Sequence, residues 1–351
     1  TCQAKTSMSL RIRCWEGYDA APYLRSFTAA TGINATAETL ISDASAASAL
    51  LNATDRCDVI NINNAYVQKV LDPAGCIAPL GEALTQLANH QLLAAFERFR
   101  PWMLSADGKS CIGVGQRFGA FNLVVNSRRV SRTLAEDEGF ALAADPSARY
   151  GVLCYDDFNI FHIAIAAGFD PFQSTNERQR AAFSRTARNW FSNARLVSDD
   201  HFVLNRALLA GEIDFYLSGG VYTVSPARRD GHDHLIAITP RSGPVAGRGA
   251  IAFAEMTSVT ANTRHPDKAR AFVQHMLQPD NAVRIAFAET TCNPVAQMGN
   301  PDVLSAFSAD DLAVIQWDTL AEDLSYCVDY DIVPDHGVLH GLLIEAMTAN
   351  L

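Results

Sequence analysis

The stretch SLRIRCWEGYDAAPYLRSFTAATGI, residues 9–33, carries the pattern that decides the fold. Residues 9–15 are rich in strand-forming side chains and predict a short β-strand. A helix is expected over 19–31, because apolar residues recur from Ala20 onward at i, i+3, i+4 and i+7, and Gly32 is a suitable stop.

The alternation of strand and helix continues along the chain. Strands are expected over 33–40 and 57–62, with helices over 44–52 and from 65. Two β-rich pieces follow at 110–117 and 121–126. A second series has expected strands over 150–155, 212–217, 235–239 and 250–260, and expected helices over 159–167, 175–193, 265–277 and 337–348. Pro279 is expected to end the helix over 265–277. Such a series predicts an α/β protein with a mainly parallel sheet and right-handed crossovers.

The chain has 351 residues, which is too long for one ordinary core and suits two lobes. It contains no internal repeat and no flexible linker, so strands that cross between the lobes are expected to join them and to act as hinges near 121 and 253. A cleft between lobes is a natural ligand site. We expect lobe one to be 1–121 plus 254–300, and lobe two to be 122–253 plus 301–351.

The composition argues against several classes of partner. The formal net charge is −10, whereas nucleic acids and anionic membranes select clustered Lys and Arg. No apolar run approaches the ~20 residues that span a bilayer. Residues 1–8 lack the apolar middle of a signal peptide, so we expect either a cytosolic protein or one whose signal has been removed.

The eight cysteines form no CxxC pair, which argues against zinc ribbons and thioredoxin-type sites. Buried thiols are one interpretation, since most of these cysteines lie in apolar runs. The other is that an oxidising compartment bridges some of them. The two candidate bridges are then Cys57–Cys76 and Cys292–Cys327.

The sequence matches none of the enzyme or metal-binding motifs considered below. Gly113, Gly115 and Gly119 give GxGxxxG, one residue too long for the dinucleotide fingerprint. The chain has no GxxxxGK[ST], GxSxG or HExxH motif. His232 and His234 lack a third metal ligand and predict a solvated loop. We therefore expect no catalysis, no cofactor and no metal.

Aromatic, carboxylate and other polar residues follow the ends of the expected strands. Ligands bind at these strand ends in open α/β sheets. Aromatic faces and carboxylates together suit a cationic ligand. Core aromatics and helix N-caps are the alternative interpretation. The strand-end residues are Trp15, Glu16, Tyr18, Ser42, Asp43, Asn63, Asn64, Tyr155, Asp157, Phe158, Ser218, Gly219 and Tyr222.

From about residue 9 to 300 the chain resembles the spermidine/putrescine-type periplasmic binding proteins of bacterial ABC importers. The resemblance rests on RIRCWEGYDAAPYLRSFTAATGI, CDVININNAYVQKV, FGAFNLVVNSRRV, YGVLCYDDFNIFHIAIAAG, GEIDFYLSGG and HPDKARAFVQHMLQPDNAVRIAFAET. It implies a type II periplasmic-binding fold and a monomer in the periplasm. It also implies that the protein closes on a small ligand, such as a polyamine, and delivers it to a permease with its ATPase.

Carried over by position, the resemblance makes Trp15 and Tyr18 aromatic walls of the ligand site. It makes Asp157 and Glu255 carboxylates that hold amines. Asn63 and Asn64 fall on the polar turn after the third strand, and Phe118 and Phe253 complete the implied set.

Three positions depart from the family pattern: Ile160 replaces a carboxylate, and Leu217 and Ala65 replace aromatics. A shorter cation, a quaternary amine or a zwitterion therefore fits as well as a linear polyamine. Arg117 and Arg248 could instead meet a carboxylate or sulfonate, although a salt bridge at the surface or hinge is the simpler interpretation. An enzyme on the same fold, or a ferric-ion binder using Tyr18, Tyr155 and Tyr222, are the other classes that remain open.

Overall fold

The computed structural model describes residues 9–288 and 290–349. The chain divides into two compact units. Unit 1 holds the described parts of Thr1–Phe118 and Ala254–Glu289, together with Pro294–Phe307. Unit 2 holds Gly119–Phe253, Thr290–Asn293 and the described part of Ser308–Leu351. The chain passes from one unit to the other inside two strands, β5 (Val114–Asn126) and β10 (Ala250–Thr260), and again before Thr290, after Asn293 and after Phe307.

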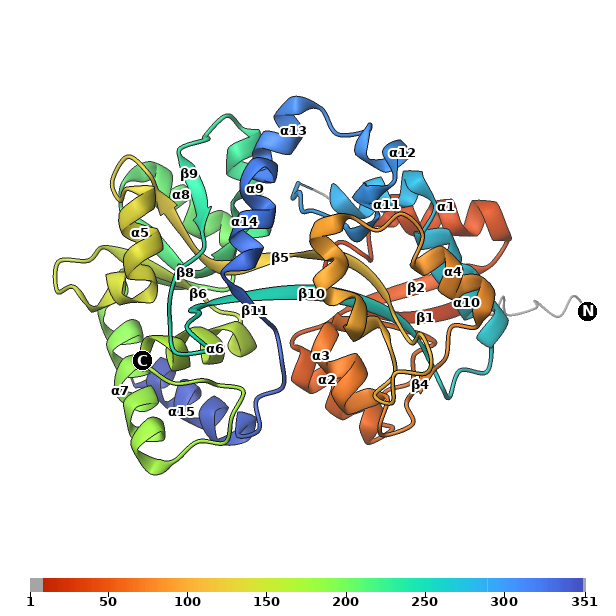
Figure 1. The fold of residues 1–351 in the computed structure, drawn as a ribbon, viewed down its shortest axis with the longest axis horizontal. Helices are drawn as coiled ribbons and strands as arrows, with labels where there is room; N and C mark the ends of the chain where they lie inside the picture. The colour runs from red at the N-terminus through yellow and green to blue at the C-terminus, as the bar shows by residue number, and fades with distance from the viewer. Residues whose placement is uncertain (1–8, 289, 350–351) are drawn as a thin grey trace, which may run out of the picture. The chain divides into compact units, whose positions relative to one another are not determined.

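The sheet of unit 1 has the order β2-β1-β3-β10. Its strands are β1 (Ser9–Cys14), β2 (Asn34–Thr39), β3 (Val59–Asn63) and the C-terminal part of β10, with β4 (Ile77–Ala78) paired to β10. β1 is parallel to β2, beside which it lies in Figure 1, and it is also parallel to β3, as the alternating pattern predicts. β10 is antiparallel to β3, so the sheet is mixed.

The helices of unit 1 follow from local sequence signals. Its longer helices are α1 (Ala21–Thr31), α2 (Asp43–Leu51), α4 (Glu82–Ala88), α10 (Pro266–Met276) and α11 (Pro279–Ala286). Gly32 ends α1 in the left-handed conformation, with φ 71°, and donates its N–H to Thr28. Pro279 does not merely end α10: it opens α11, because proline suits the first turn of a helix.

The sheet of unit 2 has the order β5-β8-β6-β7. Its strands are β6 (Tyr150–Leu153), β7 (Leu196–Ser198), β8 (Phe215–Gly220), β9 (Leu235–Ile238), β11 (Cys327–Asp329) and the N-terminal part of β10. β6 is parallel to β7 and β8, while β5 is antiparallel to β8 and β9. The two β-rich pieces expected over 110–117 and 121–126 form one continuous strand, β5.

Helices cover the sheet of unit 2. The longer ones are α6 (Asp156–Ala166), α7 (Glu177–Asn193), α8 (His201–Ala210), α9 (Val221–Arg229) and α15 (His336–Thr348). The C-terminal helix α15 packs against α7 and α6 (Figure 1). Sequence periodicity predicts α6, α7 and α15 but misses α8 and α9.

Shorter elements complete the chain. They are α3 (Asn64–Tyr66) with the π-helical turn Val67–Leu71, α5 (Arg132–Glu138), α12 (Pro301–Leu304), α13 (Ala309–Val314), α14 (Leu320–Ser325) and the 3-10 segments Ala94–Met103, Gly139–Ala144, Ala296–Gly299 and Trp317–Thr319. Within the described ranges, no helix combines the length and apolarity needed to cross a membrane.

Neither candidate disulfide forms, because Cys57, Cys76 and Cys292 are all unbridged thiols. Burial raises the pKa of the Cys57 thiol and of the Cys292 thiol to about 12, so both stay protonated. Cys57 and Cys292 are buried core side chains, as the alternative interpretation held, whereas Cys76 is half-buried. Cys2 lies outside the described residues.

Candidate functional site

Three of the strand-end residues of unit 1 meet at one carboxylate. Asp43 is the first residue of α2, after the N-cap Ser42, whose hydroxyl accepts from Ser45 N–H. Trp15 Nε1 donates to Asp43 Oδ1 at 2.9 Å. The backbone N–H of Asn63 donates to the same oxygen at 3.2 Å, and Asn63 Nδ2 donates to Oδ2 at 2.7 Å. The carboxyl ends of β1 and β3 lie at the same sheet edge, which brings these groups together.

Asn63 presents an unused hydrogen-bond acceptor at this edge. A carboxylate can only accept, so the amide nitrogen of Asn63 must face Asp43 and its Oδ1 must point elsewhere. Asn63 is 3% exposed, and Oδ1 has no partner within the described part of the chain. A buried acceptor left in that state costs about 1–3 kcal/mol. An N–H or O–H group of a ligand would remove this cost.

The neighbouring candidates of unit 1 differ in their setting. Asn64 is fully buried, and its Oδ1 accepts from the backbone N–H of Ala254 at 3.3 Å. Ser42 serves as an N-cap, and Glu16 is exposed. Phe118 lies in an aromatic cluster with Phe96 and Phe99, at centroid distances of 5.2 and 6.1 Å.

Glu255 is already neutralised by a cation of the protein itself. Arg117 Nε donates to Glu255 Oε2 at 2.8 Å and Nη2 donates to Oε1 at 3.2 Å. The Arg117 guanidinium carbon also lies 4.5 Å from the ring centroid of Tyr18. The pair is buried, with side-chain exposures of 3% and 10%. Glu255 was expected to hold a ligand amine, and in this structure its counter-ion is Arg117.

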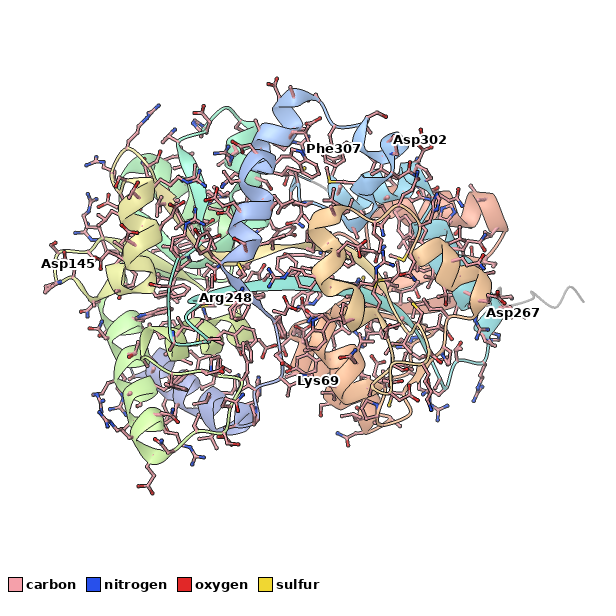
Figure 2. All side chains as sticks on the ribbon, viewed as in Figure 1. Lys69, Asp145, Arg248, Asp267, Asp302 and Phe307 are labelled. Carbon is pink, nitrogen blue, oxygen red and sulfur yellow. The ribbon has the colours of Figure 1, made fainter. Side chains whose placement is uncertain are left out.

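Tyr18 supports this pair. The backbone N–H of Arg117 donates to the Tyr18 hydroxyl at 3.1 Å. Burial raises the pKa of the Tyr18 phenol, which keeps it protonated. Gly17, with φ 95°, allows the close approach, since a Cβ there would lie 2.8 Å from Arg117 Nη1. Arg248, which lies two residues before the start of β10 (labelled in Figure 2), instead donates to the carbonyl of Cys327 at 2.9 Å.

In unit 2, Asp157 is held by two side chains from the C-terminal segment. It lies in the first turn of α6 and is 7% exposed. His336 Nε2 lies 2.7 Å from Oδ1, and the Tyr330 hydroxyl donates to Oδ2 at 3.3 Å. The hydrogen bond to Asp157 raises the pKa of His336. Asp157 is thus an oriented carboxylate whose near neighbour can change its charge.

An aromatic group lies beside this carboxylate. The ring of Phe158 lies 4.4 Å from Phe121 and 5.6 Å from Tyr330, centroid to centroid. Phe253 lies 6.2 Å from both Phe121 and Phe158, and Tyr155 lies 5.8 Å from Phe121. The structure therefore brings the predicted Tyr155, Asp157, Phe158 and Phe253 together.

Ser218 belongs to a buried network. The Phe121 carbonyl accepts from His162 Nε2 at 2.9 Å, so Nδ1 is the acceptor for the Ser218 hydroxyl, also at 2.9 Å. Asn159 Nδ2 in turn donates to Ser218 Oγ at 2.8 Å. Ser218 is fully buried and its φ is 67°, which is uncommon for a residue other than glycine. Ser218 is thus linked through His162 to the backbone carbonyl of Phe121.

Two other residues near the end of β8 were predicted to contact ligand. Gly219 has no room for a side chain, because a Cβ would lie 2.3 Å from Tyr216 Cε2. Tyr222 is half-buried in the first turn of α9, and its ring lies 5.7 Å from His201. The three departures from the family pattern, Ile160, Leu217 and Ala65, are all fully buried apolar side chains.

The strand-end argument missed the residues that hold the aspartates of α6. His336 and His340 both lie on α15, with Asp157 and Asp156 as their partners. The available signal was the spacing of the two histidines, which places them one turn apart on one helix face. No group of three or more His, Cys, Asp or Glu side chains in the described ranges could hold a metal ion.

Comparisons with known proteins identify the fold. No family model matches, and no curated protein matches. The spermidine/putrescine ABC transporter substrate-binding protein PotD of Streptococcus pneumoniae has a TM-score of 0.68 at 15% identity, covering 97% of this chain and 98% of that one. The TpPotD lipoprotein of Treponema pallidum has a TM-score of 0.72 at 12% identity, covering 97% and 99%.

A further similar structure was solved in complex with glucopine. The PBP MotA of A. tumefaciens in complex with glucopine has a TM-score of 0.63 at 16% identity, covering 97% of this chain and 98% of that one. Identities this low establish fold and leave the ligand open. The chain therefore has the α/β fold of periplasmic substrate-binding proteins, which is the fold class that its sequence predicts.

Proposed function

We propose that this chain is the substrate-binding component of an ABC importer, that it works as a monomer in the periplasm, and that it delivers a small polar molecule to a permease driven by a separate ATPase. Its fold, shared with transport binding proteins over nearly the whole chain, supports this role. The chemistry at the strand ends is suited to recognition, and no bond in the ligand is made or broken.

The observation that carries the proposal for the ligand is the oriented Asp157 carboxylate beside the aromatic rings. Aromatic faces attract a cation through their quadrupole, and a nearby carboxylate adds direct charge pairing. Glu255 already pairs with Arg117, so we do not expect it to hold a second amine of the ligand. We therefore favour a ligand with one cationic amine, which would pair with Asp157.

Ligand capture is proposed to occur by hinge closure. The candidate hinges are the points at which β5 and β10 pass from one unit to the other, after Phe118 and after Phe253. Few residues need to change their backbone angles in such a motion.

A binding screen tests this function. Thermal shift with polyamines, quaternary amines, amino acids and small sulfonates should single out a cationic amine, since a ligand at 100 times its Kd adds about 2.7 kcal/mol to stability. Calorimetry should then show that Asp157→Asn weakens its binding by about 2 kcal/mol or more, roughly 30-fold. Asp156→Asn is the matched control and should change the affinity far less, since Asp156 is the more exposed of the two aspartates.

A second candidate is a zwitterionic or anionic ligand. The observation that favours it is that both candidate anchors already have basic partners, Glu255 with Arg117 and Asp157 with His336. Stabilisation by sulfonates or amino acids alone, with unchanged affinity in Asp157→Asn, would decide for this ligand class and against the cationic amine.

A further inference from the structure

The C-terminal helix α15 presents two histidines to the two aspartates that open α6. His336 and His340 are one helical turn apart, and their rings are nearly parallel, at 14° with centroids 5.7 Å apart. His336 Nε2 lies 2.7 Å from Asp157 Oδ1, and His340 Nε2 lies 2.8 Å from Asp156 Oδ2. Because an ionised carboxylate only accepts, each Nε2 carries a hydrogen in both the neutral and the charged imidazole.

The two contacts differ in burial. The side chains of His336 and Asp157 are 26% and 8% exposed, whereas those of His340 and Asp156 are 38% and 36% exposed. Charge pairing is stronger where less solvent screens it. The His336–Asp157 contact is therefore the one at which a proton changes the local field most.

The charged groups around His336 come from each element that packs on it. Asp156 and Asp157 approach from α6, and both raise the pKa of His336, mainly through its hydrogen bond to Asp157. His340 stacks on it from α15 itself. On the side of α7, Arg180 lies 3.6 Å from Asp335, which precedes His336 and also accepts two hydrogen bonds from Thr175.

The geometry points to a role for His336 in ligand recognition: we propose that a cationic ligand and the His336 proton compete for the charge of Asp157, so that binding of the cation releases that proton to the solvent. This inference rests on the proposed function. With His336 charged, Asp157 is already neutralised. With His336 neutral, Nε2–H still orients the carboxylate, and its full negative charge is available to the ligand.

The expected consequence is an affinity that rises with pH. Below the pKa of His336, each bound cation displaces one proton, so the affinity should rise up to about tenfold per pH unit. Above that pKa the affinity should level off. An anionic ligand at the same place would show the opposite slope.

The coupling can first be tested without ligand. NMR titration of the imidazole signals in the full chain, assigned by the loss of one set in His336→Gln, should give His336 a pKa above its ordinary value of about 6.5. Asp157→Asn should lower that pKa more than Asp156→Asn does. Equal effects of the two changes, or none, would overturn the assignment of Asp157 as the dominant partner.

The second test uses choline and putrescine as probes, since both keep their charge from about pH 5.5 to about pH 8.5. Calorimetry should show affinity that rises with pH in the wild-type protein, is flat in His336→Gln, and still rises in the matched control His340→Gln. Proton release should appear as a dependence of the binding heat on the ionisation heat of the buffer. A pH slope unchanged by His336→Gln, or pH-independent binding, would overturn the proton coupling alone, whereas failure of both amines to bind would overturn the cationic ligand as well.

Discussion

Removing the Glu255 carboxylate should destabilise unit 1 strongly. The Arg117 guanidinium is 3% exposed and makes two hydrogen bonds to Glu255, at 2.8 and 3.2 Å. In Glu255→Ala it would stay buried beside Tyr18 without its counter-ion. Breaking one side of such a pair costs about 3–5 kcal/mol. At roughly 2–4 °C per kcal/mol, Tm should fall by about 6–20 °C.

The assay is urea unfolding followed by circular dichroism, with each transition treated separately because two units can unfold independently. The double variant Arg117→Met with Glu255→Leu should recover most of the loss, because it removes both buried charges. Glu97→Ala is the control. It breaks an exposed pair with Arg100, whose side chains are 47% and 38% exposed, and should cost less than about 1 kcal/mol. A Glu255→Ala protein as stable as the wild type, or a double variant worse than the sum of the single ones, would refute the reasoning.

Three further predictions concern unit 2 and use the same unfolding assay. Burial lowers the pKa of His162 to about 3, so between that value and its unfolded value of about 6.5 only the unfolded chain binds the proton. As the pH is lowered through this window, the free energy of unfolding should decrease by up to about 1.4 kcal/mol per pH unit, and His162→Gln should flatten that slope. Ser218→Ala should cost about 1–3 kcal/mol through the lost hydroxyl, and Ser218→Gly, which suits φ 67°, should cost less; the reverse order would contradict the strain at this residue. Gly219→Ala should cost about 1–3 kcal/mol because its Cβ would clash with Tyr216, whereas Gly341→Ala on α15, with nothing within 4 Å, should gain about 0.5–1 kcal/mol; equal effects would argue against both.

Local sequence was sufficient wherever the deciding interactions are local. The strand over Ala250–Thr260 was predicted to the residue, and α1 ends at Gly32 because a left-handed residue is needed there. The strand-end rule also predicted that Trp15, Asp43 and Asn63 would lie close together, since neighbouring parallel strands end at the same sheet edge. The proximity of two side chains can therefore be predicted from sequence where it depends only on which strands end at the same sheet edge.

Only the tertiary structure shows which basic side chain pairs with each candidate carboxylate. Arg117 and Glu255 are 138 residues apart, and His336 and Asp157 are 179 residues apart. No periodicity or turn signal connects segments so distant, because the energy of such a pair depends on burial and on the distance between two charges. The sequence therefore determined the fold class and the edges where ligand chemistry gathers. Packing alone decided that Glu255 is neutralised by an arginine and that Asp157 is held by a histidine whose charge depends on pH.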